Sequence, residues 1–428
     1  MTAEILIMNR LAVALAADSA LTIGSGRKIF NSSNKLFALS KHHPVGIMIY
    51  GYPELSGIPF ETIIKLFREE RKTKSCETIS EYFNCFIEFI SNKKELFMEE
   101  YQEFVLRIIC KNFLEHLINE YFLLIDEKIK TAEDINKLSF EKVLNEHLKE
   151  DYESFKEIGF IETYNQEKME NLVTLYDDII SEEINQIKEI NFTKKQKKII
   201  KELVIGFYVK KEIEHDFITG IVIAGFGETE IFPAYKKVTI KGVINNCLIL
   251  DKLEETKIGV DTYSNIRSFA QTDMVQIFMN GLHPNHRLWL HGFLGEIFTN
   301  YPKKIIEELP LQNNSLKKAI IKKFTKESMK IYDEFLEKET DIIKAHYQPI
   351  LDIVDVLPKD ELASMAESLV NLTMFKRKVS AQVESVGGPI DVAVISKGDG
   401  FIWIKRKHYF KAELNPSFLK QHYTNIKE

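Results

Sequence analysis

The chain of 428 residues is 45% hydrophobic, 11% aromatic and 28% charged, which is typical of a globular protein and excludes a disordered one. Its formal net charge of −6 predicts no general attraction to nucleic acid or to an anionic membrane. No apolar run reaches the roughly 18 residues that cross a bilayer, and the four scattered cysteines form no CxxC pair. We therefore expect a cytoplasmic protein with free thiols and no membrane or nucleic-acid partner.

The first 60 residues carry strand patterns. Two short apolar runs, EILIM and LAVALAAD, flank Asn9-Arg10, which predicts a two-residue hairpin turn. Two further strands are expected over 35–39 and 45–52, followed by an amphipathic helix over 60–72.

Pairing the two strands outward from the turn places Thr2 opposite Ala17 and Met1 opposite Asp18. A methionine that precedes a small residue is normally removed, so Thr2 is expected to become the first residue. Its free α-amine would then act as the base for its own hydroxyl, which is one way to activate this weak nucleophile. A nearby lysine would lower the pKa of the hydroxyl, and Asp18 would hold that lysine in place.

The rest of the chain alternates between helical and strand patterns. The segment from about 76 to 211 has almost no glycine or proline, and its apolar residues recur at three- and four-residue steps, which indicates a helical hairpin or bundle. The remaining expectations are strands over 217–228 and 231–244, helices over 265–282, 283–355 and 358–379, and a closing hairpin over 390–406.

This order predicts one mixed α+β core that is interrupted twice by helices. The expected divisions are a first core piece at 1–75, a helical insertion at 76–211, a second core piece at 212–282, a second helical insertion at 283–355 and a third core piece at 356–428.

Four features of the N-terminal region carry a resemblance to a known family. They are Thr2, the segment AADSALT around Asp18, the lysine of SNKLFAL and the glycine of MIYGYPELSG. Together they resemble the proteasome β-subunit family, a branch of the N-terminal nucleophile hydrolases. The bacterial proteasome-like heat-shock protease and the short bacterial proteasome homologues are the nearest comparisons. The resemblance covers the three core pieces, about half of the chain.

The resemblance implies a four-layer αββα sandwich with two large helical insertions, and a threonine-type peptidase. Thr2 matches the nucleophile, and Asp18 matches the aspartate sixteen residues further on. Lys35 matches the lysine, with Lys28 as a weaker rival. Gly51 matches the glycine whose backbone N–H stabilises the tetrahedral intermediate.

The match to the groups around the nucleophile is less complete. Where the family places a Ser-Gly pair, this chain reads FAQTD, so that Thr272 or Gln271 would have to substitute. Ser385 matches the family's late serine, but the aspartate expected three residues before it is absent, and Glu384 is an uncertain replacement.

The substrate pocket of the family falls on apolar residues here, which favours cleavage after hydrophobic residues. These pocket residues are Leu21, Phe37, Ile49 and Pro53. No metal or organic cofactor is implied, and the histidines of LHPNHRLWLHG fit no strong zinc signature.

The expected partners are a peptide or protein substrate, further copies of the chain in a homo-oligomer, and a regulatory protein that binds the helical insertions. Two other functions stay open. If Met1 is retained, the chain would be a non-catalytic scaffold or partner-binding protein; if the insertions narrow the cleft, it would be an amidase that acts on small acylated compounds. A buried Asp18–Lys35 pair is expected in either case, because an unpaired carboxylate is costly to bury.

Overall fold

The computed structural model describes residues 2–23, 28–131, 140–310, 313–380, 386–408, 410–411 and 414–417. The chain forms two compact units. The first comprises Met1–Leu36, Ile231–Pro233 and Lys257–Glu428, and the second comprises Phe37–Glu230 and Ala234–Thr256. Helices combined with antiparallel sheets confirm the expected α+β class, whereas the four-layer order stays a prediction.

The first unit is built on a five-stranded sheet in the order β12-β1-β2-β13-β14, in which every neighbouring pair is antiparallel. β1 and β2 are buried along their whole lengths, which explains why they read as continuous apolar runs rather than alternating ones. The strands are β1 (Ala3–Asn9), β2 (Ala12–Ala17), β12 (Ser264–Ala270), β13 (Asp391–Ser396) and β14 (Gly400–Lys405).

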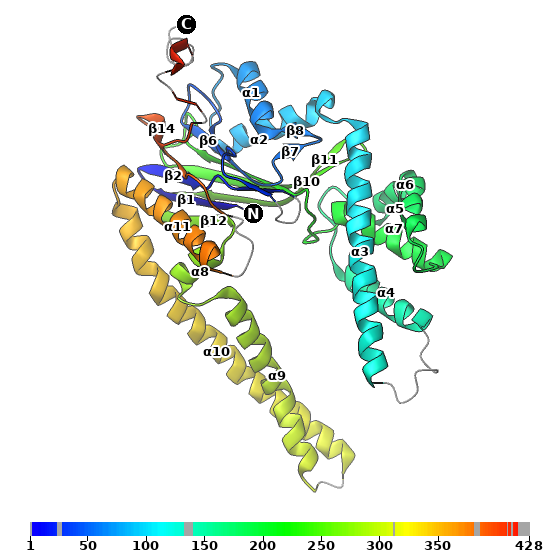
Figure 1. Ribbon diagram of the computed structural model, residues 1–428. Helices are drawn as coiled ribbons and strands as arrows, with labels where there is room; N and C mark the ends of the chain where they lie inside the picture. The colour runs from blue at the N-terminus through cyan, green and yellow to red at the C-terminus, as the bar shows by residue number, and fades with distance from the viewer. Residues whose placement is uncertain are drawn as a thin grey trace. The chain divides into compact units, whose positions relative to one another are not determined.

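Helix α11 (Lys359–Val379) covers one face of this sheet (Figure 1). The alternate residues of β1 and β2 that face the helix include Ile5, Ile7 and Ala14, and they share one apolar cluster with Leu362 and Val370. The three alanines that β2 contributes to this cluster are small, so the helix backbone can approach the sheet closely. Burial of this face is the main stabilising term of the unit.

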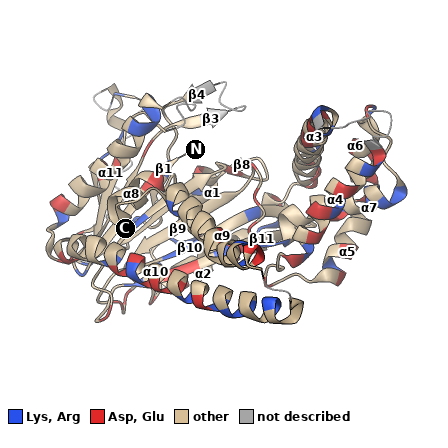
Figure 2. Ribbon diagram, turned by 90° about the horizontal axis from the view of Figure 1, so that it is seen from below, with Lys and Arg blue, Asp and Glu red and all other residues tan. Residues whose placement is uncertain are grey.

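Two long helices, α9 (Pro284–Glu308) and α10 (Asn314–Val356), follow the short α8 (Asp273–Asn280) and pack against each other as a hairpin (Figure 1). Asn313 caps α10 by accepting hydrogen bonds from the backbone N–H groups of Ser315 and Leu316. Lys and Arg alternate with Asp and Glu along α10 in Figure 2, as expected of a helix with solvated faces.

The second unit contains another five-stranded sheet, in the order β11-β10-β9-β6-β5. Asn245 and Asn246 connect β10 to β11 with positive φ angles of 49° and 54°, which suits the tight turn of a hairpin. The sequence analysis did not anticipate β11. The strands are β5 (Leu36–Ala38), β6 (Val45–Gly51), β9 (Thr219–Gly225), β10 (Ala234–Ile244) and β11 (Cys247–Lys257).

Helices α1 (Phe60–Arg71) and α2 (Ile79–Asn92) contribute to the apolar cluster of this sheet. Phe67 contacts Phe86 and Phe89 edge to face, with ring centroids 5.1 and 5.4 Å apart. Phe86 is fully buried, so the aromatic residues of α1 and α2 serve as core.

The remaining helices of the second unit pack around a second apolar cluster. The capping box of Thr193 and Gln196 fixes the start of the last of them. They are α3 (Glu99–Thr131), α4 (Phe140–Glu157), α5 (Gln166–Leu175), α6 (Asp177–Gln186) and α7 (Lys194–Val209), and the 3-10 turn η1 (Lys94–Leu96) precedes them.

Two short ladders complete the structure: β3 (Leu21–Ile23) with β4 (Lys28–Phe30), and β7 (Glu54–Leu55) with β8 (Ile58–Pro59). Among the residues that the structure describes, no helix is both long and apolar enough to cross a membrane.

The predicted register of the first hairpin is wrong by two residues. Met8 pairs with Val13 rather than with Leu11, and Glu4 pairs with Ala17. The turn is longer because the Asn9 side chain takes part in it: its Oδ1 accepts hydrogen bonds from the N–H groups of Leu11 and Ala12, at 2.9 and 3.2 Å.

A shift of two residues keeps every side chain on its predicted face. It does, however, change the neighbour of Asp18, whose backbone N–H donates to the carbonyl of Ala3 at 3.1 Å.

The helix predicted over 265–282 is also wrong in its first half. Residues Ser264–Ala270 form β12 and pair with all of β1, and the helix begins only at Asp273. The positive φ of Ala270, 63°, ends the strand. The apolar spacing of Ile266 and Phe269 suits a helix, but pairing with β1 decides the structure.

We expect Asn9→Ala to lower the free energy of unfolding by about 2–4 kcal/mol. Asn9 is fully buried, and its Nδ2 donates to the carbonyls of Val354 and Leu357, both at 2.9 Å, so that the substitution leaves these acceptors without their donor. Denaturant unfolding measures the effect. Arg10→Ala is the matched control; it removes a half-exposed side chain 3.8 Å from Asp355 and should cost less than about 1 kcal/mol.

Candidate active site

Thr2 lies directly before β1 and is 4% exposed. Its carbonyl accepts a hydrogen bond from the backbone N–H of Gln271 at 3.0 Å, at the end of β12. The next residue, Ala3, pairs with Ala270. The ladder therefore fixes the backbone of Thr2, while Met1 lies outside the described residues.

Asp18 follows β2 and is fully buried, yet its carboxylate accepts four hydrogen bonds. Oδ1 accepts from the N–H of Ala3 at 2.9 Å and from Lys35 Nζ at 2.7 Å. Oδ2 accepts from the N–H groups of Ala20 and Gly387 at 3.1 and 3.0 Å. A buried carboxylate with this many donors is well satisfied in its charged form.

Lys35 is 5% exposed and forms an ion pair with Asp18. Burial lowers the pKa of its amine, while the charge of Asp18 and the hydrogen bond to it act in the opposite direction. A buried lysine with a lowered pKa gives up a proton more readily than an exposed one. Through Asp18, Lys35 adjoins the start of β1. Its role as a polarising group stays a prediction, and the rival Lys28 side chain lies outside the described residues.

Glu4 is a buried carboxyl group that the sequence analysis did not select. It is fully buried, and neither carboxyl oxygen has a hydrogen-bond partner among the described residues. Burial raises the pKa of Glu4 well above its usual value; the charge of Lys35 lowers it and that of Asp18 raises it. The uncharged form of the Glu4 carboxyl group is therefore more favoured than it is in an exposed glutamate.

A second buried ion pair lies in the same unit. Asp391, at the start of β13, pairs in register with Ala17 and is 2% exposed. It forms an ion pair with the Lys407 side chain and also accepts from the backbone N–H of Lys407 at 2.8 Å. The charge of Lys407 further lowers the pKa of Lys35, so the two pairs interact electrostatically.

Glu4 and Asp391 share a sequence signal that could have identified them. Each is a single carboxylate at the edge of an otherwise apolar strand, AEILIM and IDVAVI. Because a charged group inside such a strand must be paired or neutral, that pattern marks an interaction or a shifted pKa.

Of the two residues predicted to assist the nucleophile, Thr272 is described by the structure and Ser385 is not. Thr272 precedes α8, and its Oγ1 accepts a hydrogen bond from Gln276 Nε2 at 3.2 Å, so its hydroxyl contacts the first turn of the helix. Ser385 and the neighbouring Glu384 lie outside the described residues. Gly387, which is described, donates its backbone N–H to Asp18.

Gly51 ends β6 in the second unit with a φ of 84°. A Cβ atom at this position would lie 2.3 Å from the carbonyl oxygen of Ile218, so no other residue fits without a backbone shift. The backbone therefore requires a glycine at position 51 whether or not this residue takes part in catalysis. Its role as a donor to the reaction intermediate stays a prediction.

The four predicted pocket residues are divided between the units. Phe37 and Ile49 belong to the apolar cluster of the second unit and are 7% and 6% exposed, so both serve as core. Leu21 lies in β3 of the first unit, and Pro53 is half-buried in the loop after β6. Their function as a specificity pocket stays a prediction.

The histidines of the second helical segment have local partners. His283 caps α9 by accepting from the N–H of Asn285 at 3.1 Å. His291 lies 2.8 Å from Glu339, which also accepts from Arg287. Within the described ranges, no group of three or more His, Cys, Asp or Glu side chains has the arrangement of a metal site.

We expect Lys35→Met to lower the free energy of unfolding by about 3–5 kcal/mol, because it leaves the charge of Asp18 buried without its cation. Denaturant unfolding at pH 7 measures the loss. Lys359→Met is the control in the same unit: it breaks an ion pair with Asp399 whose partners are both exposed, so stability should change little. An equal loss in both variants would contradict the importance of burial.

We expect Glu4→Gln to raise the melting temperature at pH 7 and to leave it unchanged near pH 4. The folded protein holds the Glu4 proton above the ordinary pKa of 4.5, so rising pH destabilises the wild-type fold until the folded pKa is passed. Glutamine removes this penalty. The exposed Glu334→Gln on α10 is the control, and its melting temperature should follow the wild type at every pH. A gain that is independent of pH would contradict the explanation.

Comparison with known proteins finds similar chains among solved structures. No family model matches the chain, and no curated protein matches it. One similar structure is an Anbu (Gly-1) mutant from Hyphomicrobium sp. strain MC1, with 10% identity, a TM-score of 0.27 and coverage of 100% of this chain and 99% of that chain. Another is Anbu (ancestral beta-subunit) from Yersinia bercovieri, with 10% identity, a TM-score of 0.26 and coverage of 99% of this chain and 96% of that chain. A third is Anbu from Hyphomicrobium sp. strain MC1, with 8% identity, a TM-score of 0.26 and coverage of 100% of this chain and 98% of that chain.

These findings correct the identification of the chain with the proteasome β-subunit family and its heat-shock protease relatives. The matching structures are Anbu proteins, which are proteasome-like but distinct, and neither a family model nor a curated protein supports the earlier identification. At these TM-scores the likeness carries no argument about fold or activity.

Proposed function

We propose that the chain is a threonine-type peptidase in which Thr2, freed by removal of Met1, is the nucleophile. One observation carries this proposal: the buried Asp18–Lys35 pair adjoins Thr2 through the hydrogen bond from Ala3 N–H to Asp18 Oδ1. A carboxylate that binds both the backbone N–H of the residue after the nucleophile and a buried ammonium group holds the cation close to the start of the chain.

The proposed reaction needs no group from outside the chain except water. An α-amine has an ordinary pKa of about 7.7–8.0, so near pH 8 a large share of it is neutral and accepts the proton of the Thr2 hydroxyl. The hydroxyl oxygen attacks the peptide carbonyl, and the amine returns the proton to the leaving amine. Water then hydrolyses the acyl-enzyme by the same route, which restores Thr2.

The other residues have supporting roles in the proposal. Lys35 polarises the hydroxyl, Asp18 orients Lys35, and the N–H of Gly51 binds the oxyanion. Thr272 and Ser385 assist proton movement around the amine. The apolar nature of Leu21, Phe37, Ile49 and Pro53 favours cleavage after hydrophobic residues of a peptide or protein.

The proposal also includes a four-layer αββα arrangement and self-association of the chain. Support for self-association comes from α9, where exposed apolar residues recur every four positions and so lie along one side of the helix. They are Trp289, Phe293, Ile297, Tyr301 and Ile305.

Intact mass spectrometry tests the nucleophile, before and after exposure to a peptide epoxyketone that captures N-terminal threonine. We expect the loss of one methionine and the gain of one adduct. Thr2→Ala should form no adduct and should lose peptidase activity by roughly 10³-fold or more, with only a small change in melting temperature. Thr2→Ser, which keeps a hydroxyl and a free amine, should retain the adduct.

Three other results would change the assignment. Retained methionine without an adduct would favour the non-catalytic scaffold. Peptidase activity that survives Thr2→Ala would exclude Thr2 as the nucleophile. A trapped Thr2 that turns over small acylated amides but no peptide would favour the amidase.

A further inference from the structure

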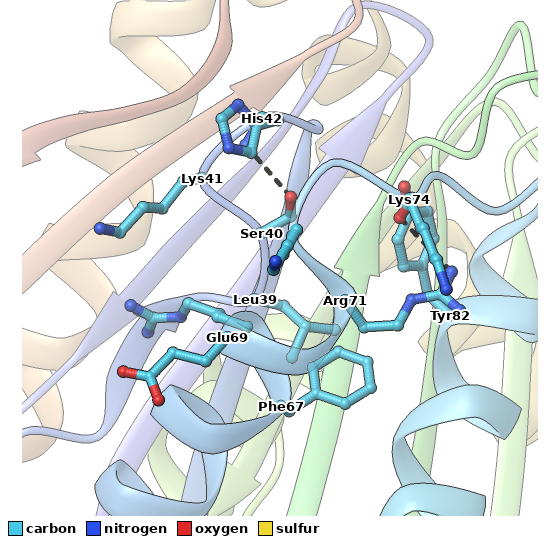
Figure 3. A pocket seen from close by; sticks show the side chains of 11 residues that line it. Leu39, Ser40, Lys41, His42, Phe67, Glu69, Arg71, Lys74 and Tyr82 are labelled. Carbon is cyan, nitrogen blue, oxygen red and sulfur yellow. Dashed lines mark hydrogen bonds between the residues drawn. The ribbon is translucent and has the colours of Figure 1, made fainter. Parts of the chain in front are cut away.

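A cavity of about 170 Å³ opens in the second unit, and no residue with a role in the proposed reaction lines it. Its walls come from the loop between β5 and β6, the C-terminal end of α1 and the segment that leads into α2. Figure 3 shows Leu39 and Phe67 at its base, with Lys41 and Glu69 on one side and Arg71 and Lys74 on the other.

The cavity is strongly cationic. Five basic side chains line it, namely Lys41, Arg68, Arg71, Lys72 and Lys74, against the single carboxylate of Glu69. This local excess stands in a chain whose net charge is −6. Like charges this close repel each other, so an anion placed among them would be strongly attracted.

Three of these cations have no partner within the described part of the chain. The side chains of Lys41, Lys72 and Lys74 form no ion pair or hydrogen bond there, whereas Lys93 lies 3.0 Å from Glu70. The unpartnered lysines are therefore available to a ligand.

The helix dipole does not account for the cluster. Basic residues at a helix C-terminus are favourable because they interact with its last carbonyl groups. Here the carbonyls of Arg68 and Arg71 already accept hydrogen bonds from the backbone N–H groups of Lys72 and Lys74, both at 2.9 Å. Lys41, moreover, comes from a different part of the chain.

Arg71 is held in place before any ligand arrives. Its Nη2 donates to the carbonyl of Ser75 at 3.1 Å and lies 3.0 Å from Cys76 Sγ. Its Nε is buried and has no hydrogen-bond partner among the described residues. The contacts of Nη2 thus pre-organise the guanidinium group.

The size of the cavity limits the ligand to a small group. Sites for drug-sized molecules have volumes of about 300–1,000 Å³, so about 170 Å³ suits a single anionic group with a short attachment. Four more cations than anions favour a dianion over a carboxylate. Lysine as a point charge and arginine as a planar donor are the usual ligands of phosphate.

We propose that this cavity is a binding site for a small phosphate-bearing anion, formed by Lys41, Arg71, Lys72 and Lys74. The shared chemistry is a phosphate dianion, either free or as a small phosphomonoester. The proposal does not depend on the reaction of Thr2.

Isothermal titration of the full chain tests it, with inorganic phosphate and glycerol 3-phosphate as separate titrants at low ionic strength. We expect saturable binding that added NaCl weakens, because the attraction is electrostatic. Tighter binding of glycerol 3-phosphate would identify the ligand as a phosphomonoester, and equal or tighter binding of inorganic phosphate would identify it as the free ion.

The variant Lys72→Gln/Lys74→Gln should weaken phosphate binding at least tenfold. Lys194→Gln/Lys195→Gln is the matched control; it removes the same charge from two exposed lysines of α7 in the same unit and should bind as the wild type does. Circular dichroism without phosphate verifies that both variants fold. Lys41→Gln, on the other wall, should weaken binding by about threefold or more and provides the test if the double variant fails to fold.

Two results would overturn the proposal. One is the absence of saturable phosphate binding by the wild type beyond the effect of NaCl at equal ionic strength. The other is an equal loss of affinity in the Lys72/Lys74 variant and in the α7 control, which would show a general charge effect. Thr2→Ala should bind phosphate normally, which separates this site from the proposed peptidase.

Discussion

The buried carboxylate of Asp18 is the constraint on which the first unit depends. Water cannot reach it, so the chain must supply every donor. Those donors come from β1, from the loop after β2, from Lys35 and from Gly387, which lies 369 positions further along the chain. Satisfying one charge thus fixes the start of the chain, the segment before β5 and the segment before β13 at one place.

This arrangement explains why the ion pair is structural and, at the same time, suited to chemistry. Its attraction is partly offset by the desolvation of both partners, so stability alone is a weak reason to keep it. Burial also lowers the pKa of Lys35 and raises that of Glu4, so that Lys35 gives up a proton more readily, and Glu4 holds one more tightly, than the exposed groups would. Groups with shifted pKa values, held beside a buried threonine, are what a proton-transferring site requires.

Much of the first unit could be predicted from local pattern, because burial dictates sequence there. Continuous apolar runs identified β1, β2 and β6. The cost of burying a lone carboxylate predicted a cation beside Asp18, whereas the choice of Lys35 came from the resemblance to a known family. The hairpin register could not be predicted, since it depends on Asn9 replacing backbone groups in the turn. For β12, pairing with β1 overrides an apolar spacing that suits a helix. Glu4 and Asp391 were not predicted as buried charged groups, because each stands at the edge of an apolar strand and only the fold shows that the position is buried.

Two sets of lysines in the chain differ in a way that the sequence alone does not show. Lys35 and Lys407 are buried and therefore paired, because an unpaired ammonium group cannot be left in an apolar interior. Lys41, Lys72 and Lys74 are exposed at a cavity and within the described residues have no partner, a state that solvent permits but that mutual repulsion opposes. Pairing of a buried charge is required by the fold and so says little about function. Crowding of exposed like charges is not required by the fold, and it is therefore the stronger indication of a ligand.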